Sequence, residues 1–166
     1  MSQSKGLAGF IAHVAKHVTQ APAGARGKIA FVLRIGQDYA NIQLGDIGRP
    51  LRFLKQMAGS PPVQFGRSGF KPELVDDYAP ARHYTAFVFV GFWLPYLPAI
   101  AVLWFWEVLG FIRYKGEWSA ADIRMGYVGI RHGTLLRRSV PAVLPRLIAR
   151  DLASAGETNT DIDIVA

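Results

Sequence analysis

The chain has 166 residues, with 19 Lys and Arg against 12 Asp and Glu, so its formal net charge is +7 at pH 7. Hydrophobic residues make up 51% of it and charged residues only 19%, a composition typical of a small membrane subunit or of one apolar, basic domain. Because it has no cysteine, disulfides, thiol catalysis, iron–sulfur ligation and every zinc site that needs cysteine are excluded.

Residues 1–59 are predicted to form basic amphipathic helices rather than a core of their own. In the first helix the apolar residues recur at i, i+3, i+4, i+7 and i+11: Leu7, Phe10, Ile11, Val14 and Val18. A second helix is expected over residues 28–41, and a third begins near Pro50 and ends before Gly59. Each apolar face is narrow, which predicts that a membrane surface or a neighbouring subunit covers it.

Two histidines in the first helix have the spacing of a metal site. His13 and His17 stand four residues apart and therefore share one helical face. No Glu follows His13 as in the HExxH motif, and the sequence offers no third ligand. We therefore predict that no metal ion is bound there.

A Pro- and Gly-rich linker over residues 60–83 leads into the most apolar part of the chain. The run YTAFVFVGFWLPYLPAIAVLWFW, from Tyr84 to Trp106, has no ionisable group except its tyrosines. As a helix it would be roughly 35 Å long, enough to cross a hydrocarbon layer of about 30 Å. We predict one transmembrane helix over residues 84–112, kinked at Pro95 and Pro98. The alternative, a buried element of a soluble core, would need caps or turns inside the run.

Glu107 interrupts an apolar stretch that otherwise continues to Arg113. Placing a charged carboxylate inside the hydrocarbon layer costs free energy, so two interpretations of Glu107 are possible. Glu107 either reaches water at the level of the headgroups or contacts a polar group on a partner helix. The basic residues Arg113 and Lys115, which follow it, are predicted to extend to lipid phosphates.

Residues 113–166 are expected to form an irregular extension. Residues 118–138 contain scattered glycines and arginines without a clear period, and no element is predicted there. Residues 141–152 are predicted to form a short amphipathic helix with Leu144, Leu147, Ile148 and Leu152 directed inward. The chain is thus predicted to be an all-α membrane protein in four parts: residues 1–59, 60–83, 84–112 and 113–166.

No catalytic arrangement is found in the sequence. It has no phosphate-binding loop, no GxSxG turn and no carboxylate pair in one segment, so we predict no enzymatic activity and no cofactor. The basic residues are evenly spaced on amphipathic helices, which suits anionic lipid better than nucleic acid. Residues 1–84 hold 11 Lys and Arg against 5 Asp and Glu, which favours the N-terminal side facing the cytoplasm or matrix. Residues 1–37 contain no acid, as in a mitochondrial import signal.

In the run VLWFWEVLGFIRYKG, an aromatic-rich stretch is followed by Glu107, two aliphatic residues, Gly110 and the basic residues Arg113 and Lys115. This order, together with the upstream segments KIAFVLRIGQDYANI and GRPLRFLKQM, resembles subunit g of the mitochondrial ATP synthase, a small single-span protein of the membrane sector. The resemblance covers roughly residues 7–58 and 99–116. The family usually has Gly where Trp106 stands, so the GxxxG pattern for close helix packing is missing here.

The resemblance implies a non-catalytic subunit of the Fo sector in the mitochondrial inner membrane, with its N-terminus in the matrix. Subunit e and other membrane subunits would be its neighbours, and it would support dimer assembly and membrane curvature. Anionic phospholipid such as cardiolipin is the expected ligand of its basic residues. The candidate lipid and partner contacts are Glu107, Gly110, Arg113, Lys115, Arg49, Arg52 and Lys55. The alternative is a single-span accessory subunit of a respiratory-chain complex such as complex I.

Overall fold

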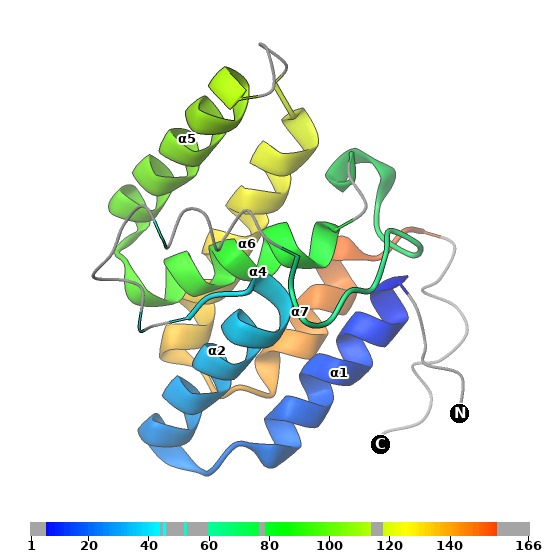
Figure 1. The fold of residues 1–166 in the computed structure, drawn as a ribbon. Coiled ribbons are helices and arrows are strands. Elements are labelled where there is room, and N and C mark those ends of the chain that lie inside the picture. Colours follow the sequence, from blue (N-terminus) through cyan, green and yellow to red (C-terminus); the bar gives the residue numbers. More distant parts are fainter. Residues whose placement is uncertain are drawn as a thin grey trace.

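The fold is built from helices, as the sequence predicts. The computed structural model describes residues 6–43, 45, 52, 60–76, 79–113 and 118–155. Within these ranges the chain forms six α-helices and one short 3-10 helix (Figure 1): α1 (Gly6–Gln20), α2 (Gly24–Ala40), η2 (Pro72–Leu74), α4 (Pro80–Trp93), α5 (Tyr96–Arg113), α6 (Ala120–Arg138) and α7 (Val143–Leu152). The predicted helix near Pro50 lies almost wholly outside the described residues.

The amphipathic patterns predicted for α1 and α7 are confirmed by burial, but the prediction that a membrane surface or a neighbouring subunit covers the apolar face of α1 is wrong, because the chain's own core covers it. Leu7, Phe10 and Val14 of α1 are fully buried, and Ile11 and Val18 pack against the same core from partly exposed positions. The four residues of α7 that were expected to point inward are all buried: Leu144, Leu147, Ile148 and Leu152.

The predicted transmembrane helix over residues 84–112 is wrong, because the chain breaks within it. Leu94 precedes Pro95, whose ring disfavours a helical conformation in the residue before it, and Leu94 has extended backbone angles (φ −103°, ψ 148°). Helix α4 therefore ends at Trp93, and α5 begins at Tyr96 in a different direction (Figure 1). In the described parts of the chain, no helix combines the length and the apolar character needed to cross a membrane.

Helix α6 occupies the stretch for which the sequence predicted no element. It begins where the Ser119 hydroxyl accepts a hydrogen bond from the backbone N–H of Asp122 (2.8 Å), a typical N-cap. It ends with Arg137 and Arg138, whose positive charges suit the helix C-terminus. Lys28 of α2 also donates from Nζ to the carbonyl oxygens of Arg137 (2.9 Å) and Ser139 (2.8 Å) at this end. Each end of α6 is thus stabilised by a side chain.

Helices α4 and α6 approach each other very closely through glycines. A Cβ atom on Gly129 would lie 2.7 Å from the carbonyl oxygen of Tyr84, and one on Gly133 would collide with the carbonyl oxygen of Val88. On the other helix, a Cβ on Gly91 would collide with the backbone of Ile130. A helical glycine costs about 1 kcal/mol relative to alanine, so the close packing compensates for a weak intrinsic helix.

The segment predicted as a linker packs on the helical core. Phe65 and Phe70 are buried, and the Phe10 ring lies 5.2 Å from that of Phe65 and 5.9 Å from that of Tyr84. Backbone hydrogen bonds join this segment to both ends of the described chain, from Leu7 N–H to the Ser68 carbonyl oxygen (2.8 Å) and from Lys71 N–H to the Leu152 carbonyl oxygen (2.8 Å). It therefore fastens the start of α1 and the end of α7 to each other.

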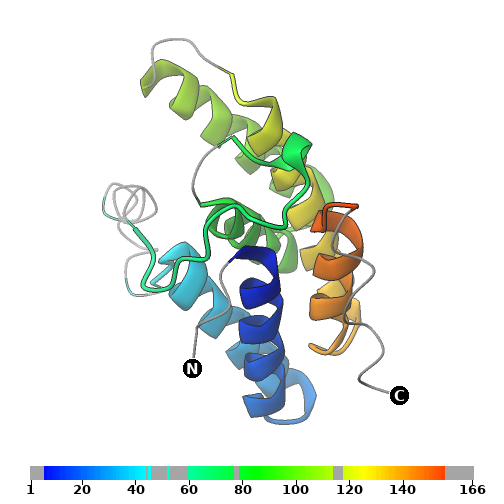
Figure 2. The same ribbon diagram turned by 90° about the vertical axis from the view of Figure 1, so that its right-hand side faces the viewer.

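Helix α5 lies at one end of the molecule. In both ribbon views it is at the opposite end from the connection between α1 and α2, and its outer side has no other described element over it (Figures 1 and 2). The helix packs on α4 and α6 along only one side. The rest of its surface is not covered by any described element of the chain.

Candidate functional site

Three of the predicted contact residues lie on one helix, α5. Glu107 and Gly110 both lie on α5, and Arg113 is its last residue. Arg52 is exposed, whereas Arg49, Lys55 and Lys115 lie outside the described residues. A Cβ atom built on Gly110 would meet no atom within 4 Å, so the close helix contacts of this chain are made by the glycines of α4 and α6 instead.

One narrow stripe of α5 faces the rest of the protein. Ala99, Leu103 and Glu107 are spaced four residues apart and are the buried residues between Tyr96 and Ile112. Leu103 and Ala99 pack with Phe87 of α4 and Ile130 of α6. Glu107 continues the stripe, so the acid that interrupts the apolar sequence points into the protein.

The carboxylate of Glu107 meets two polar side chains from neighbouring helices. Its Oε1 lies 3.9 Å from Nε2 of His83 on α4, and Nδ1 of His83 lies 3.7 Å from Oδ1 of Asp122 on α6. Nε2 of His83 is buried and has no hydrogen-bond partner among the described residues. The polar group that Glu107 approaches thus belongs to its own chain.

Both members of this pair are driven toward their neutral forms. Burial, together with the charge of the nearby Asp76, raises the pKa of Glu107 from 4.5 to about 7. Burial lowers the pKa of His83 from 6.5 to about 4, although a hydrogen bond with the backbone of Asp122 opposes that shift. At neutral pH the contact is therefore between a neutral imidazole and a carboxyl group that is close to its titration point.

The outer face of α5 is a large exposed apolar surface, which we call the α5 face. Leu97 is 78% exposed and Phe105 is 58% exposed, values that are unusual for such side chains. The α5 face comprises Trp93, Tyr96, Leu97, Val102, Trp104, Phe105, Val108, Ile112 and Trp118. Apolar surface that is contiguous on this scale marks a place where another molecule binds.

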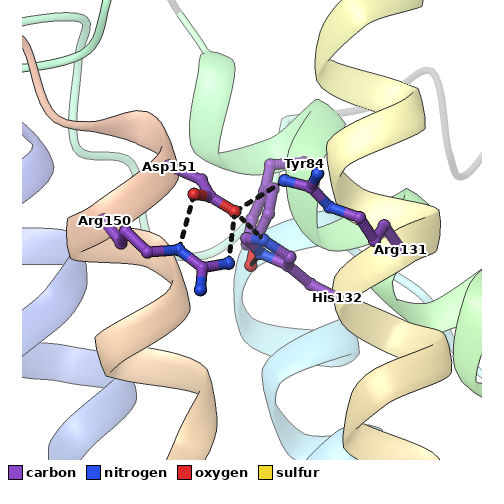
Figure 3. Close-up of polar contacts among 5 residues, drawn as sticks. All are labelled: Tyr84, Arg131, His132, Arg150 and Asp151. Atoms are coloured by element: carbon purple, nitrogen blue, oxygen red, sulfur yellow. Dashed lines mark hydrogen bonds and ion pairs between the residues drawn. The ribbon is translucent and has the colours of Figure 1, made fainter.

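A second polar cluster joins α4, α6 and α7 in the core (Figure 3). The hydroxyl of Tyr84 lies 2.8 Å from Nδ1 of His132, and Nε2 of His132 lies 2.8 Å from Oδ2 of Asp151. Arg131 donates to Oδ2 of Asp151 at 2.6 Å, and Arg150 donates to both carboxylate oxygens at 2.8 and 3.0 Å. Every side chain in the cluster therefore has a partner.

The charges of this cluster assign its protons. The hydrogen bonds from Arg150 hold the pKa of Asp151 well below its usual range, so its carboxylate is an acceptor only. Burial lowers the pKa of His132, which favours the neutral ring. His132 then carries its hydrogen on Nε2, facing Asp151, and accepts the Tyr84 hydroxyl hydrogen at Nδ1.

This arrangement has the order of a proton relay but is closed to a substrate. The side chains of His132 and Tyr84 are 0% and 1% exposed. A general base must come within hydrogen-bond reach of the proton that it removes from a substrate. Since neither group reaches the surface, the geometry favours a structural role, in which the cluster holds three helices together.

The described residues offer no arrangement suited to a metal ion. No group of three or more His, Asp or Glu side chains within the described ranges could hold one. His13 packs against the ring of Phe65 (5.2 Å between centroids), while Nε2 of His17 lies 3.3 Å from Oδ2 of Asp38. Burial lowers the pKa of His17, which favours the neutral ring at this contact.

Sequence reasoning missed His132 because it predicted no helix over residues 118–138, and without His132 nothing singled out Asp151 in the predicted helix over residues 141–152. The glycines at 126, 129 and 133 follow a spacing of three and four residues, which places them on one helical face. Read as a stripe of small residues, this spacing would have indicated a helix that packs closely on another. It would also have placed His132 beside the buried face.

Comparison with models of known protein families, with characterised proteins and with solved structures finds no match.

Proposed function

We propose that the chain is a non-catalytic subunit of a membrane protein complex and that the α5 face binds the membrane. One observation carries the proposal. Among the described residues, nine of the thirteen large hydrophobic side chains that are exposed lie between Trp93 and Trp118. A surface of this kind, on a helix whose acid is turned inward, is what an interfacial helix presents to lipid.

The composition of the α5 face favours a bilayer surface as its occupant. Three exposed tryptophans, Trp93, Trp104 and Trp118, lie before, within and after α5. Tryptophan prefers the boundary between headgroups and acyl chains, because its ring is apolar and its N–H is polar. The overall charge of +7 adds attraction to anionic lipid. In this arrangement α5 lies along the membrane and does not cross it.

The resemblance to subunit g supports a more specific form of the proposal. The run VLWFWEVLGFIRYKG covers α5 from Val102 to its end and the residues just after it. In this form the complex is the mitochondrial ATP synthase, the membrane is the inner membrane, and subunit e is a neighbour. The role would be support of dimer assembly and membrane curvature. The alternative is an accessory subunit of a respiratory-chain complex such as complex I.

Membrane binding can be tested by flotation of the purified chain with phosphatidylcholine vesicles. The variant L97D/F105D places two charges on the α5 face at well-exposed positions. Ile29, an exposed apolar residue of α2, provides the matched control I29D. We expect the wild type and I29D to float with the vesicles and L97D/F105D to stay behind. Equal flotation of all three proteins would refute membrane binding through α5.

The identity of the complex requires a separate experiment in the native cell. A tagged chain would be followed on native gels that are stained for ATP hydrolysis and for NADH oxidation. Comigration with the ATP-hydrolysing band supports the ATP synthase. Comigration with the NADH-oxidising band supports the alternative, and migration of the chain by itself contradicts both.

A further inference from the structure

Three arginines and two apolar residues form an exposed line along α6, which we call the α6 stripe. Arg124, Tyr127, Arg131, Leu135 and Arg138 occupy positions i, i+3, i+7, i+11 and i+14, and all are exposed. Successive arginines are seven residues apart, which is about 10 Å along the helix axis. The opposite side of α6 holds the glycines that pack against α4. The α6 stripe is therefore the outward face of the central helix.

We propose that the α6 stripe binds the headgroups of anionic phospholipids, next to the membrane-bound α5 face. This inference depends on the proposed function, and it adds the class of lipid and the residues that recognise it. The stripe lies in the part of the chain that the resemblance to subunit g does not cover.

The α6 stripe and the α5 face are continuous. Trp104 of α5 donates a hydrogen bond from Nε1 to the hydroxyl oxygen of Tyr127 on α6 (3.2 Å). The ring of Trp118, which precedes α6, lies 6.2 Å from that of Trp104 and 4.8 Å from that of Phe111. A membrane that covers the α5 face at Trp104 therefore also contacts the α6 stripe at Tyr127.

The charge of this region suits an anionic surface. Residues 118–155 contain six arginines, no lysine and only two acids, Asp122 and Asp151. Arg131 is held by Asp151, but no carboxylate of the described residues forms an ion pair with Arg124 or Arg138. A guanidinium group binds a phosphate with two parallel hydrogen bonds, so these two arginines are suited to lipid phosphates.

Tyr127 and Leu135 favour a lipid surface over nucleic acid. They alternate with the arginines along the same line, so the stripe is half polar and half apolar. Lipid offers phosphates and apolar chains at one boundary, and long arginine side chains span the two environments. A nucleic-acid duplex offers phosphates on this scale but no apolar layer beside them.

The test compares vesicles of phosphatidylcholine with vesicles that also contain phosphatidylglycerol. The variant R124Q/R138Q removes two charges from the stripe, and R26Q/R34Q removes two charges from exposed positions on α2 as a control. Each arginine near an anionic surface contributes about fivefold to partitioning, so R124Q/R138Q should bind anionic vesicles about 25-fold more weakly than the wild type. R26Q/R34Q should lose much less of its binding to anionic vesicles. All three proteins should bind neutral vesicles equally.

The outcomes separate this inference from the proposed function. The α6 stripe is not the lipid site if R124Q/R138Q binds anionic vesicles as tightly as the wild type does. The same conclusion follows if R26Q/R34Q loses as much binding to these vesicles as R124Q/R138Q. In either case, membrane binding through α5 would still be supported if L97D/F105D binds neither neutral nor anionic vesicles. Binding of the wild type to duplex DNA but to neither vesicle would overturn both proposals. Unchanged circular dichroism spectra establish that the variants are folded.

Discussion

Oε1 of Glu107 on α5 lies 3.9 Å from Nε2 of His83 on α4, and burial favours the neutral form of each group. This pair is the polar end of an otherwise apolar contact between α5 and its neighbours. Because the two pKa shifts are opposite in direction, they have opposite effects on stability as the pH changes.

Between about pH 4.5 and 6.5 the Glu107–His83 pair should contribute little net change to the stability of the wild type, so the rise expected there comes from His17 and His132, whose pKa values burial also lowers. The native state holds the proton of Glu107 more tightly than the unfolded chain does, so this group makes stability fall as pH rises from 4.5 to about 7. The native state holds the proton of His83 less tightly, so this group makes stability rise between about pH 4 and 6.5. The two contributions nearly cancel where the ranges overlap.

Single variants should expose each contribution. H83Q removes the contribution of His83, so its free energy of unfolding should rise less than that of the wild type from pH 4 to pH 6.5, by up to about 3 kcal/mol. E107Q leaves His83 alone, so the free energy should rise over pH 4 to 6.5. Urea denaturation at a series of pH values measures both. Parallel pH profiles for the wild type and both variants would show that the pair does not have these pKa values.

Adding a methyl group between α4 and α6 should destabilise the protein. G133A places a Cβ against the carbonyl oxygen of Val88, so we expect a loss of about 2–4 kcal/mol despite the better helix propensity of alanine. G110A makes the same change on α5, where the Cβ meets open space, and should be neutral or stabilising by up to about 1 kcal/mol. Thermal and urea denaturation compare the two variants. A G133A protein as stable as G110A would mean that the helices are not in such close contact.

Loss of the Tyr84 hydroxyl should leave Nδ1 of His132 without its donor in a buried place. We expect Y84F to lower the free energy of unfolding by about 1–3 kcal/mol. The matched change Y127F removes an exposed hydroxyl that accepts from Trp104, and we expect it to cost less than about 0.5 kcal/mol. Denaturation curves for the two variants decide this. Equal small losses would show that the buried hydrogen bond contributes little.

Lys28 should stabilise the C-terminal end of α6 by its contacts with two backbone carbonyls. K28M keeps an extended apolar stem but leaves the carbonyl oxygens of Arg137 and Ser139 without this donor, at a cost of about 1–2 kcal/mol. K16M, on an exposed lysine of α1, should change stability by less than about 0.5 kcal/mol. Hydrogen exchange at the end of α6 offers a local measurement. Exchange that is unchanged in K28M would contradict the capping role.

The sequence predicted those helices whose buried face is apolar. In α1 and α7 large aliphatic and aromatic residues recur at helical spacing, and the core covers that face. In α6 much of the buried face is glycine, which contributes close approach rather than apolar surface. A search for hydrophobic residues that recur at helical spacing does not detect a face made of glycines.

The break between α4 and α5 shows a second limit of hydropathy. A window of apolar residues measures composition, and the run from Tyr84 to Trp106 passes that test. Pro95 was expected to bend the helix, but the extended conformation of Leu94 ends it. The cluster of Tyr84, His132 and Asp151 could not be predicted, because it depends on how α4 packs against α6 and α7, which lie far from it in the sequence.

The segment around Ser68 and Lys71, with its backbone hydrogen bonds to Leu7 and Leu152, has a consequence for folding kinetics. Helical proteins fold fast when most contacts are between residues near each other in sequence, and these bonds join residues that are far apart. Their formation closes long loops, which costs chain entropy before other contacts repay it. We therefore expect this protein to fold more slowly than a helical bundle of its size whose neighbours in space are neighbours in sequence.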